Sequence, residues 1–309
     1  MGKIAFIFPG QGVQTTGMGK DFYDAFSVSA DVYNRADKIR PVSSLCFEAS
    51  EEELKKTYNS QVAIVTTSLA MYESFKSLCD IEPDYVLGHS LGEYCALYSA
   101  GVFDLESAVK LISKRSELMN EAAEENQGTM AAVIGLKADT ISECVKSIDG
   151  VYIANYNSPE QVVITGLVPA VKEAEEVLKA AGAKRVVPLS VSGAFHSPFM
   201  RNASNKFVKY LESFEFKDAK YPVITNIDAK ETVNGEQLKH KLPFQIHTSV
   251  YWVQSINYLI SKGVDTFVEI GPGKVLAGLN KRISPDIKTY NVNSVESLHE
   301  TIKLMKESL

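Results

Sequence analysis

Gly88-His89-Ser90-Leu91-Gly92 follows the apolar segment 85–87 and precedes a helical pattern. A strand, a Gly-x-Ser-x-Gly turn and a helix in this order form a nucleophile elbow, whose tight turn exposes the serine hydroxyl. Two glycines flank the turn because a Cβ atom at either place would collide with the neighbouring strand or helix. The helix N-terminus also directs free N–H groups toward an oxyanion formed at Ser90. The pattern predicts a nucleophilic Ser90, against the alternative of an ordinary glycine-bracketed turn.

Similar strand–turn–helix units lie on both sides of the elbow. Residues 4–8 are a continuous apolar run that ends in Pro-Gly, as expected of a buried parallel strand. Residues 61–79 are apolar on nearly every side, which predicts a buried helix. Further strands are expected over 222–225 and 265–270. We therefore predict an α/β fold in which a large, α/β-hydrolase-like domain has a parallel sheet covered on both faces.

Residues 126–193 do not continue this repetition of strand, turn and helix. Apolar helical faces are expected around 141–148 and 171–181, and the polar segment 155–159 is typical of a turn. The predicted strands are 129–136, 151–154, 161–165 and 184–189. The order βαββαβ is that of a ferredoxin-like domain. We predict a discontinuous catalytic domain over 1–125 and 194–309, with a ferredoxin-like small domain inserted at 126–193.

Composition narrows the class of protein. A chain of 309 residues with 45% hydrophobic and 23% charged residues is an ordinary globular protein, near the upper limit for one core. The net charge of −6 and the lack of an extended basic run exclude nucleic acid as an expected partner. The four cysteines are scattered without metal spacing, which favours a reducing, cytoplasmic setting. The apolar run at residues 4–8 is too short for a membrane span.

A serine nucleophile needs a base, and one histidine is better placed than the others. His196 lies in Gly193-Ala194-Phe195-His196-Ser197, a loop just after the last strand of the predicted insertion, at the seam between domains. A histidine that is merely hydrogen-bonded in this loop is the alternative. The other histidines are His89, His240, His247 and His299. No acid between Ser90 and His196 has distinctive surroundings, so the group that orients His196 is open, and a backbone carbonyl is one candidate.

Arg115 continues the apolar stripe of the helix expected after Asp104. Arginine is rarely buried without a partner, and its guanidinium can hold a carboxylate through two parallel hydrogen bonds. From the residues alone, three interpretations stay open: substrate binding, a structural ion pair, or a stripe that has drifted to the surface.

The loop Gly10-Gln11-Gly12 follows the first predicted strand. It is no phosphate-binding P-loop, because Met18 follows Gly17 where that motif needs Lys. Gln11 at its tip is a candidate donor to an oxyanion.

Taken together, these motifs are similar to those of the malonyl-CoA:acyl carrier protein transacylases of bacterial type II fatty-acid synthesis, within the wider acyltransferase domain family. The resemblance runs nearly end to end, and it depends on the number and order of the motifs. They are Phe8-Pro9-Gly10-Gln11-Gly12, Gly88–Tyr94, Gln161–Gly166, Gly193–Ser197, Thr225–Ala229 and Glu269–Gly273.

The resemblance implies a role for each candidate residue. Ser90 would carry the acyl group and His196 would be its base, while Arg115 would bind the malonyl carboxylate. Gln11 and the backbone N–H of Leu91 would form the oxyanion hole. Gln245 matches the position whose main-chain carbonyl orients the histidine, which would account for the missing acid.

The resemblance also implies the reaction and its partners. The malonyl group would pass from malonyl-CoA to the phosphopantetheine thiol of acyl carrier protein by a ping-pong mechanism, for fatty-acid synthesis. No cofactor or metal is expected, the carrier contact would be transient, and a monomer is expected. A serine hydrolase and a non-catalytic acyl-binding subunit are the alternatives. An acidic carrier would suit basic docking residues, and the candidates are Lys184, Arg185, Lys274, Lys281 and Arg282.

Overall fold

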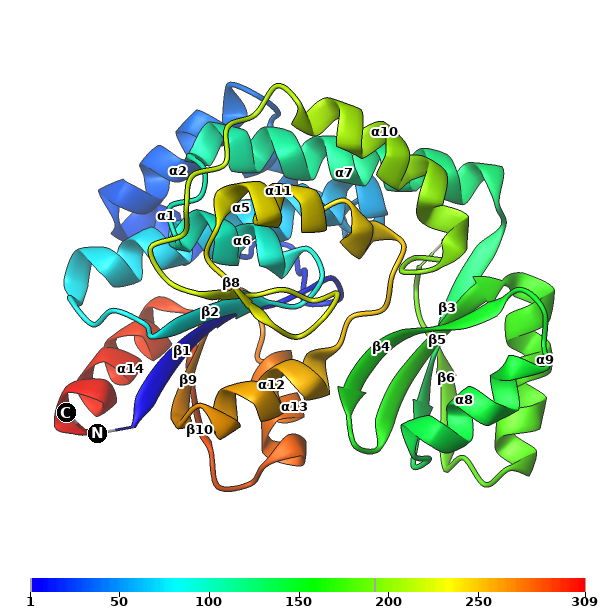
Figure 1. The fold of residues 1–309 in the computed structure, drawn as a ribbon. Helices are drawn as coiled ribbons and strands as arrows, with labels where there is room; N and C mark the ends of the chain where they lie inside the picture. The colour runs from blue at the N-terminus through cyan, green and yellow to red at the C-terminus, as the bar shows by residue number, and fades with distance from the viewer. Residues whose placement is uncertain (1, 192, 309) are drawn as a thin grey trace.

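Two β-sheets organise the chain in a computed structural model that describes residues 2–191 and 193–308 (Figure 1). One sheet has six strands in the order β10-β9-β1-β2-β7-β8, and the other has four in the order β4-β5-β3-β6. The predicted domain boundaries, 1–125 with 194–309 and 126–193, stay a prediction. Their residues 1, 192 and 309 lie outside the described residues.

The six-stranded sheet is parallel except at one edge. Its strands are β1 (Lys3–Phe8), β2 (Tyr85–Gly88), β7 (Val223–Ile224), β8 (Glu231–Thr232), β9 (Val264–Ile270) and β10 (Lys288–Val292). The first strand pairs in parallel with both β2 and β9, whereas the two-residue edge strand β8 runs antiparallel to β7. The expected strands at 4–8, 222–225 and 265–270 are thus confirmed.

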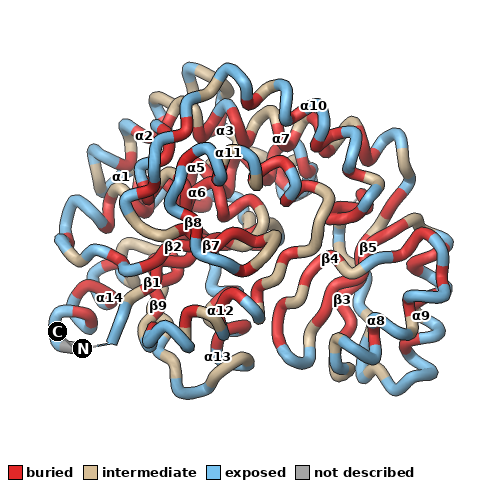
Figure 2. Tube along the Cα trace, viewed as in Figure 1, coloured by how far each residue is buried: buried red, intermediate tan, exposed pale blue. Residues whose placement is uncertain are grey.

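Alternating side chains of β1 explain why helices cover both faces of this sheet. Phe6 and Phe8 belong to the large core shared with α5, α6 and α7, whereas Ala5 and Ile7 join a smaller core with α12 and α13. The central strands are therefore buried on both sides, as Figure 2 shows in red. Continuous apolar strands of this kind are typical of parallel sheets with helices on both faces.

The helices around the six-stranded sheet vary from one turn to six. They are α1 (Lys20–Ala25), α2 (Ser27–Asp37), α3 (Val42–Phe47), α4 (Glu51–Lys55), α5 (Thr57–Leu78), α6 (Gly92–Ser99), α7 (Leu105–Glu125), α10 (Arg201–Leu211), α11 (Gly235–Lys241), α12 (Trp252–Ser261), α13 (Val275–Ile283) and α14 (Val295–Ser308). Short 3₁₀ turns precede α10 and α12, at Pro198–Met200 and Phe244–Ile246. Asp104 caps α7 by accepting a hydrogen bond from the N–H of Ser107 at 2.8 Å.

The four-stranded sheet is antiparallel and carries two helices on one face (Figure 1). Its elements are β3 (Gly128–Ile134), α8 (Ala138–Lys146), β4 (Val151–Ser158), β5 (Gln161–Leu167), α9 (Val168–Ala180) and β6 (Arg185–Pro188). Ile141, Val171 and Leu178 from the two helices are fully buried against it.

The turn predicted over 155–159 is wrong in extent. Strand β4 continues through Ser158, with irregular register between Ile153 and Asn155. Asn155 also forms a bridge to Val250, which gives this polar segment a strand partner outside its own sheet. Turn-forming residues are therefore held in a strand by a tertiary contact that local sequence does not contain.

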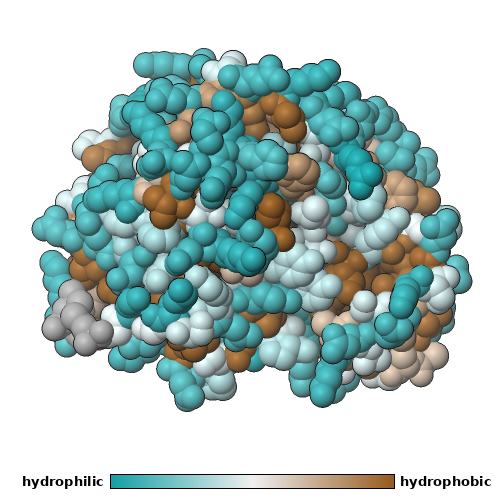
Figure 3. Space-filling model, viewed as in Figure 1, coloured by the Kyte–Doolittle hydropathy of each residue, from teal (hydrophilic) through white to brown (hydrophobic). Residues whose placement is uncertain are grey.

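Hydrophilic residues cover most of the face drawn in Figure 3, with apolar residues scattered between them. Among the described residues, no helix has the length and apolar character needed to cross a bilayer.

Candidate active site

The turn between β2 and α6 has the geometry of a nucleophile elbow. Ser90 adopts a left-handed backbone conformation with φ of 52°. A Cβ atom on Gly88 would lie 1.9 Å from the carbonyl carbon of Gly92, and one on Gly92 would lie 2.2 Å from the carbonyl oxygen of Phe8. Both positions therefore exclude any side chain, which allows the turn to lie against the end of β1.

Ser90 is hydrogen-bonded to His196, a residue 106 positions later in the chain. The distance from Oγ to Nε2 is 2.8 Å. On its other side, Nδ1 of His196 lies 2.8 Å from the main-chain oxygen of Gln245 and 3.2 Å from that of Thr248. Carbonyl oxygens only accept, so Nδ1 carries the proton and Nε2 of the neutral ring is free to accept the Ser90 proton.

The surroundings keep His196 unprotonated. Burial lowers the pKa of its imidazole from the usual 6.5 to about 3, and the positive charge of Arg115 acts in the same direction. The ring is 5% exposed. A neutral imidazole in contact with a serine hydroxyl is chemically a general base.

Arg115 projects from α7 toward the same hydroxyl. Its side chain is 1% exposed, so the apolar stripe has not drifted to the surface. Its Nη2 atom donates to Ser90 Oγ at 3.1 Å and to Gln245 Oε1 at 2.9 Å, while Nη1 donates to Gln61 Oε1 at 2.6 Å. All three acceptors are neutral, and the buried Nε has no partner among the described residues. Within that part of the chain, the guanidinium has no hydrogen-bonded carboxylate, which argues against a structural ion pair.

A cavity of 450 Å³ opens beside Ser90, Arg115 and His196. Residues of both sheets form its walls. Gln11, Gln61 and Met119 come from the six-stranded part, and Met130, Asn155, Asn157 and Val163 come from β3, β4 and β5. A substrate in this cavity would therefore contact both parts of the molecule at once.

The candidate oxyanion donors lie at this cavity. Gln11 lines its wall, and its Nε2 donates to Thr57 Oγ1 at 3.3 Å. Leu91 is buried and precedes α6, which begins at Gly92, so its N–H comes before the first intrahelical hydrogen bond.

Several residues at the site carried no recognised sequence signal. His89 does not face Ser90 as a base; its Nε2 lies 2.9 Å from Asn157 Oδ1 and 3.4 Å from Asn155 Nδ2. Both asparagines belong to the segment that was expected to be a turn. Gln61 could have been noticed, because it is the one amide side chain in the segment 61–79 that was predicted to be a buried helix.

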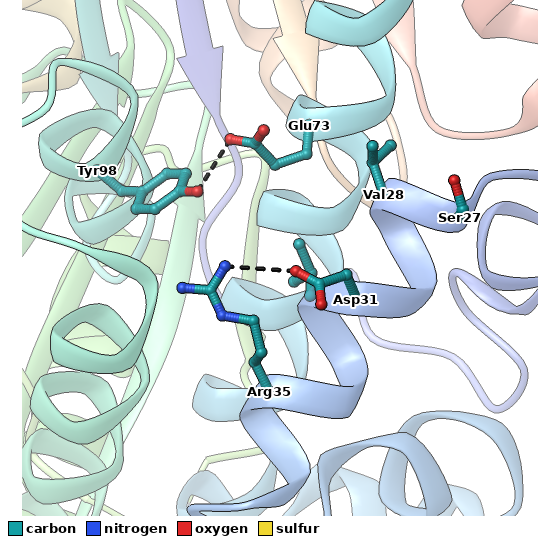
Figure 4. A pocket seen from close by; sticks show the side chains of 7 residues that line it. Ser27, Val28, Asp31, Arg35, Glu73 and Tyr98 are labelled. Carbon is teal, nitrogen blue, oxygen red and sulfur yellow. Dashed lines mark hydrogen bonds and ion pairs between the residues drawn. The ribbon is translucent and has the colours of Figure 1, made fainter.

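Two other hollows differ in character. One, of 500 Å³, also borders His196 and is lined partly by Tyr152, Tyr156 and Tyr251. The other, of 340 Å³, lies between α2, α5 and α6 and is drawn in Figure 4. There Tyr98 donates to Glu73 at 2.9 Å and Arg35 pairs with Asp31 at 3.4 Å, so these polar groups already have partners.

An elbow serine paired with a histidine is the arrangement of enzymes that act on acyl groups. The acyl transferase domain family matches residues 5–297. Malonyl CoA-acyl carrier protein transacylase of Bacillus subtilis (strain 168) is 44% identical, over 99% of this chain and 98% of that protein. The transacylase of the same description from Staphylococcus aureus (strain MSSA476) is 40% identical, over 96% and 98%.

Solved structures of transacylases are also similar to this chain. A malonyl-transacylase in complex with its type II PKS acyl-carrier protein superposes with a TM-score of 0.95 at 37% identity, covering 98% of this chain and 99% of that one. Malonyl CoA-acyl carrier protein transacylase from Clostridium perfringens gives 0.94 at 35% identity, covering 99% and 98%. The chain is an acyltransferase and belongs to the acyl transferase family, among the malonyl CoA-acyl carrier protein transacylases.

Proposed function

We propose that this enzyme transfers the malonyl group from malonyl-CoA to the phosphopantetheine thiol of acyl carrier protein, through a malonyl ester of Ser90. The observation that carries the proposal is the meeting of three groups. A nucleophile, a neutral base 2.8 Å from it and a buried cation 3.1 Å from it share one cavity. The first two suit a thioester, and the third suits an acyl group that ends in a carboxylate.

In the first half-reaction Ser90 attacks the thioester carbonyl of malonyl-CoA. The hydroxyl proton passes to Nε2 of His196 as the C–O bond forms. The oxyanion then collapses, the C–S bond breaks, and the imidazolium returns the proton to the departing CoA thiolate. The N–H of Leu91 and the amide of Gln11 are the proposed donors to the oxyanion.

In the second half-reaction the carrier thiol is the nucleophile and Ser90 is the leaving group. His196 takes the proton from the carrier's pantetheine thiol, whose sulfur attacks the malonyl ester. As the C–O bond breaks, the proton returns to Ser90 Oγ. The main-chain carbonyl of Gln245 holds Nδ1 protonated throughout and stabilises the imidazolium, in the place that an acid takes in other triads.

Arg115 is proposed to hold the malonyl carboxylate. Its contacts with neutral oxygens in the free enzyme are weaker than bidentate pairing with a carboxylate, so substrate would replace them at a net gain. The buried Nε, which has no hydrogen-bond partner among the described residues, provides a further donor for this exchange.

We further propose how the chain and its cellular setting fit this reaction. The part built on the six-stranded sheet is α/β-hydrolase-like. The part built on the four-stranded sheet is ferredoxin-like, because its elements follow the order βαββαβ and its strands lie in the order β4-β5-β3-β6.

The substrates supply the carbonyl and the thiol, so no metal or redox cofactor is required. Cys46, Cys79, Cys95 and Cys144 are free, which supports a cytoplasmic location. We propose a monomer that contacts the carrier transiently and supplies fatty-acid synthesis.

Intact mass spectrometry tests the covalent intermediate. One malonyl group should appear after malonyl-CoA is added, it should map to Ser90, and it should disappear when holo-carrier is added. An equal adduct on Ser90→Ala protein would contradict the proposal. Release of CoA without carrier acylation would instead identify hydrolysis.

A further inference from the structure

Glu93 is a buried carboxyl group that the proposed mechanism does not use. It lies in the first turn of α6, three residues after Ser90, and is 2% exposed. Its Oε2 accepts hydrogen bonds from the N–H of Asn226 and from Nε2 of Gln245, both at 3.0 Å. A buried carboxyl group that hydrogen-bonds Gln245, whose main-chain oxygen holds His196, is expected to have a role at the active site.

Gln245 connects Glu93 to Ser90, Arg115 and His196. Its Nε2 also donates to the main-chain oxygen of Ser90 at 2.9 Å. Its Oε1 accepts from Arg115 Nη2 at 2.9 Å, and its main-chain oxygen lies 2.8 Å from His196 Nδ1. Among the described residues, the fully buried Gln245 side chain is thus the one that is hydrogen-bonded directly to both the Glu93 carboxyl and the Arg115 guanidinium, whereas a longer route runs through Asn226 and Ser90.

The groups on either side of the Gln245 amide decide which way round it lies. The two ends of an amide have nearly the same shape, so hydrogen-bond donors and acceptors set its orientation. Ionised Glu93 only accepts and Arg115 only donates, which places Nε2 against the carboxylate and Oε1 against the guanidinium. The two opposite charges also offset part of each other's burial cost through the amide between them.

We propose that Glu93 is a positioning residue that fixes the Gln245 side chain and thereby directs Arg115 toward the acyl group. This inference rests on the proposed function. It assigns to Glu93 control of the preference for a carboxylate-bearing acyl group, although Glu93 itself contacts neither Ser90 Oγ nor the cavity. Burial raises the pKa of Glu93 to about 7, whereas Gln245, the Asn226 N–H and Arg115 all favour its ionised form.

Glu93→Gln tests the role of the charge at constant size, because a second amide can present either end to Gln245. Its matched control is Glu269→Gln. Glu269 is also fully buried and accepts from the N–H groups of Leu276 and Ala277 at 3.0 and 2.8 Å, at the start of α13 and outside the active site. The measurement is kcat/KM for malonyl-CoA and for acetyl-CoA, with Tm recorded for each protein.

The expected result is a change of selectivity in one variant only. Glu93→Gln should lower the malonyl-to-acetyl ratio of kcat/KM by roughly tenfold or more, mainly through the KM for malonyl-CoA. Glu269→Gln should lower Tm and leave the ratio unchanged. An unchanged ratio in folded Glu93→Gln protein overturns the inference.

Gln245→Met keeps the main-chain carbonyl that binds His196 but removes the amide bridge, and it is informative even if Glu93→Gln does not fold. It should lower the same ratio, and the double variant should lose no more than Gln245→Met alone, because both substitutions break one connection. Additive losses, or an unchanged ratio in Gln245→Met, contradict the inference. If the wild-type enzyme accepts no malonyl group, the proposed function itself fails, whereas a selective wild type with an unaffected Glu93→Gln variant overturns the inference alone.

Discussion

Among single residues, Arg115 is a buried cation that no carboxylate of the described residues contacts through a hydrogen bond. It is 1% exposed, and its hydrogen-bond acceptors within that part of the chain are neutral oxygens. Burial lowers the pKa of its guanidinium, so the protein bears a cost for keeping this charge inside. An anionic acyl group would remove that cost, which links selectivity to a locally unfavourable arrangement.

Arg115→Ala should therefore remove most of the preference for malonyl-CoA over acetyl-CoA. Two charge-assisted hydrogen bonds of about 1.5–3 kcal/mol each correspond to roughly 10²–10⁴-fold in the ratio of kcat/KM. Steady-state kinetics with both substrates measure it. Arg35→Ala is the control, because Arg35 pairs with Glu106 at 2.8 Å away from the active site. Equal losses for both substrates would assign Arg115 a structural role instead.

His196 should remain an active base below the pH at which an ordinary histidine protonates. Its pKa is lowered to about 3, by burial and then by Arg115, so the acid limb of kcat/KM for acetyl-CoA should lie below pH 6.5. Arg115→Ala should move that limb upward, because it removes one of the causes that lower the pKa of His196. A wild-type limb at 6.5, or a limb that does not move in the variant, would contradict this expectation.

The same pKa has a consequence for stability. The unfolded chain binds a proton at His196 near pH 6.5, whereas the folded protein resists protonation until about pH 3. The contribution of His196 to the free energy of unfolding is therefore fully present above pH 6.5. It is lost as the pH falls from 6.5 to about 3, because the unfolded chain then binds a proton that the folded protein does not.

At the scale of elements, the elbow depends on how closely α6 approaches β1. A Cβ atom added to Gly92 would first meet backbone atoms, the carbonyl oxygens of Phe8 and Pro9 at 2.2 and 2.7 Å. Backbone cannot move aside as a flexible side chain can, so the strand and the helix would have to separate. The elbow geometry is thus a property of the β1–β2–α6 unit as well as of its own sequence.

Gly92→Ala should destabilise the protein by several kcal/mol and abolish acylation of Ser90, because overpacking against backbone forces the elbow open. Gly278→Ala is the matched helical control. It lies within α13 with open space around its Cβ position, so it should be neutral or stabilise by up to about 1 kcal/mol. Urea denaturation and the mass of the malonyl adduct measure both variants. Equal stability of the two proteins would refute the close-approach explanation.

In the whole molecule, the candidate active site lies where the parts built on the two sheets meet. The active-site cavity has walls from both parts, and His89 of the elbow joins Asn157 of β4 at 2.9 Å. Basic residues from both parts of the molecule also lie near the turn between β4 and β5. Lys184 lies 3.9 Å from Glu160, and Arg282 of α13 donates to the adjacent Gln161 at 3.2 Å.

An acidic carrier should bind near this turn. Replacing Lys184, Arg185, Lys274, Lys281 and Arg282 by alanine should raise the carrier's KM by roughly threefold or more at low salt, because exposed charges contribute up to about 1 kcal/mol each. The effect should shrink as ionic strength rises. Lys303→Ala with Lys306→Ala, on exposed positions of α14, is the control. An unchanged carrier KM with intact acylation would place the docking surface elsewhere.

Elements with local signals could be predicted from the amino-acid sequence. The elbow, the buried strand at 4–8 and the apolar stripe that leads to Arg115 all follow from the spacing of glycines and apolar residues over a few turns, whereas the burial of Arg115 itself is a result of packing. The same holds for the order of strands and helices between 128 and 188. These features could be predicted because neighbouring residues are enough to decide them.

Which polar groups contact one another depends on how distant segments pack. The antiparallel strand β8, the extension of β4 through Asn157, and the bridge from Glu93 through Gln245 to Arg115 join segments up to 152 residues apart. Side-chain amides and carboxyls have no periodicity that marks a distant partner, and their orientation depends on hydrogen bonds formed after the sheets pack. The identity of the nucleophile is thus local in sequence, whereas the groups that position its partners are set by packing.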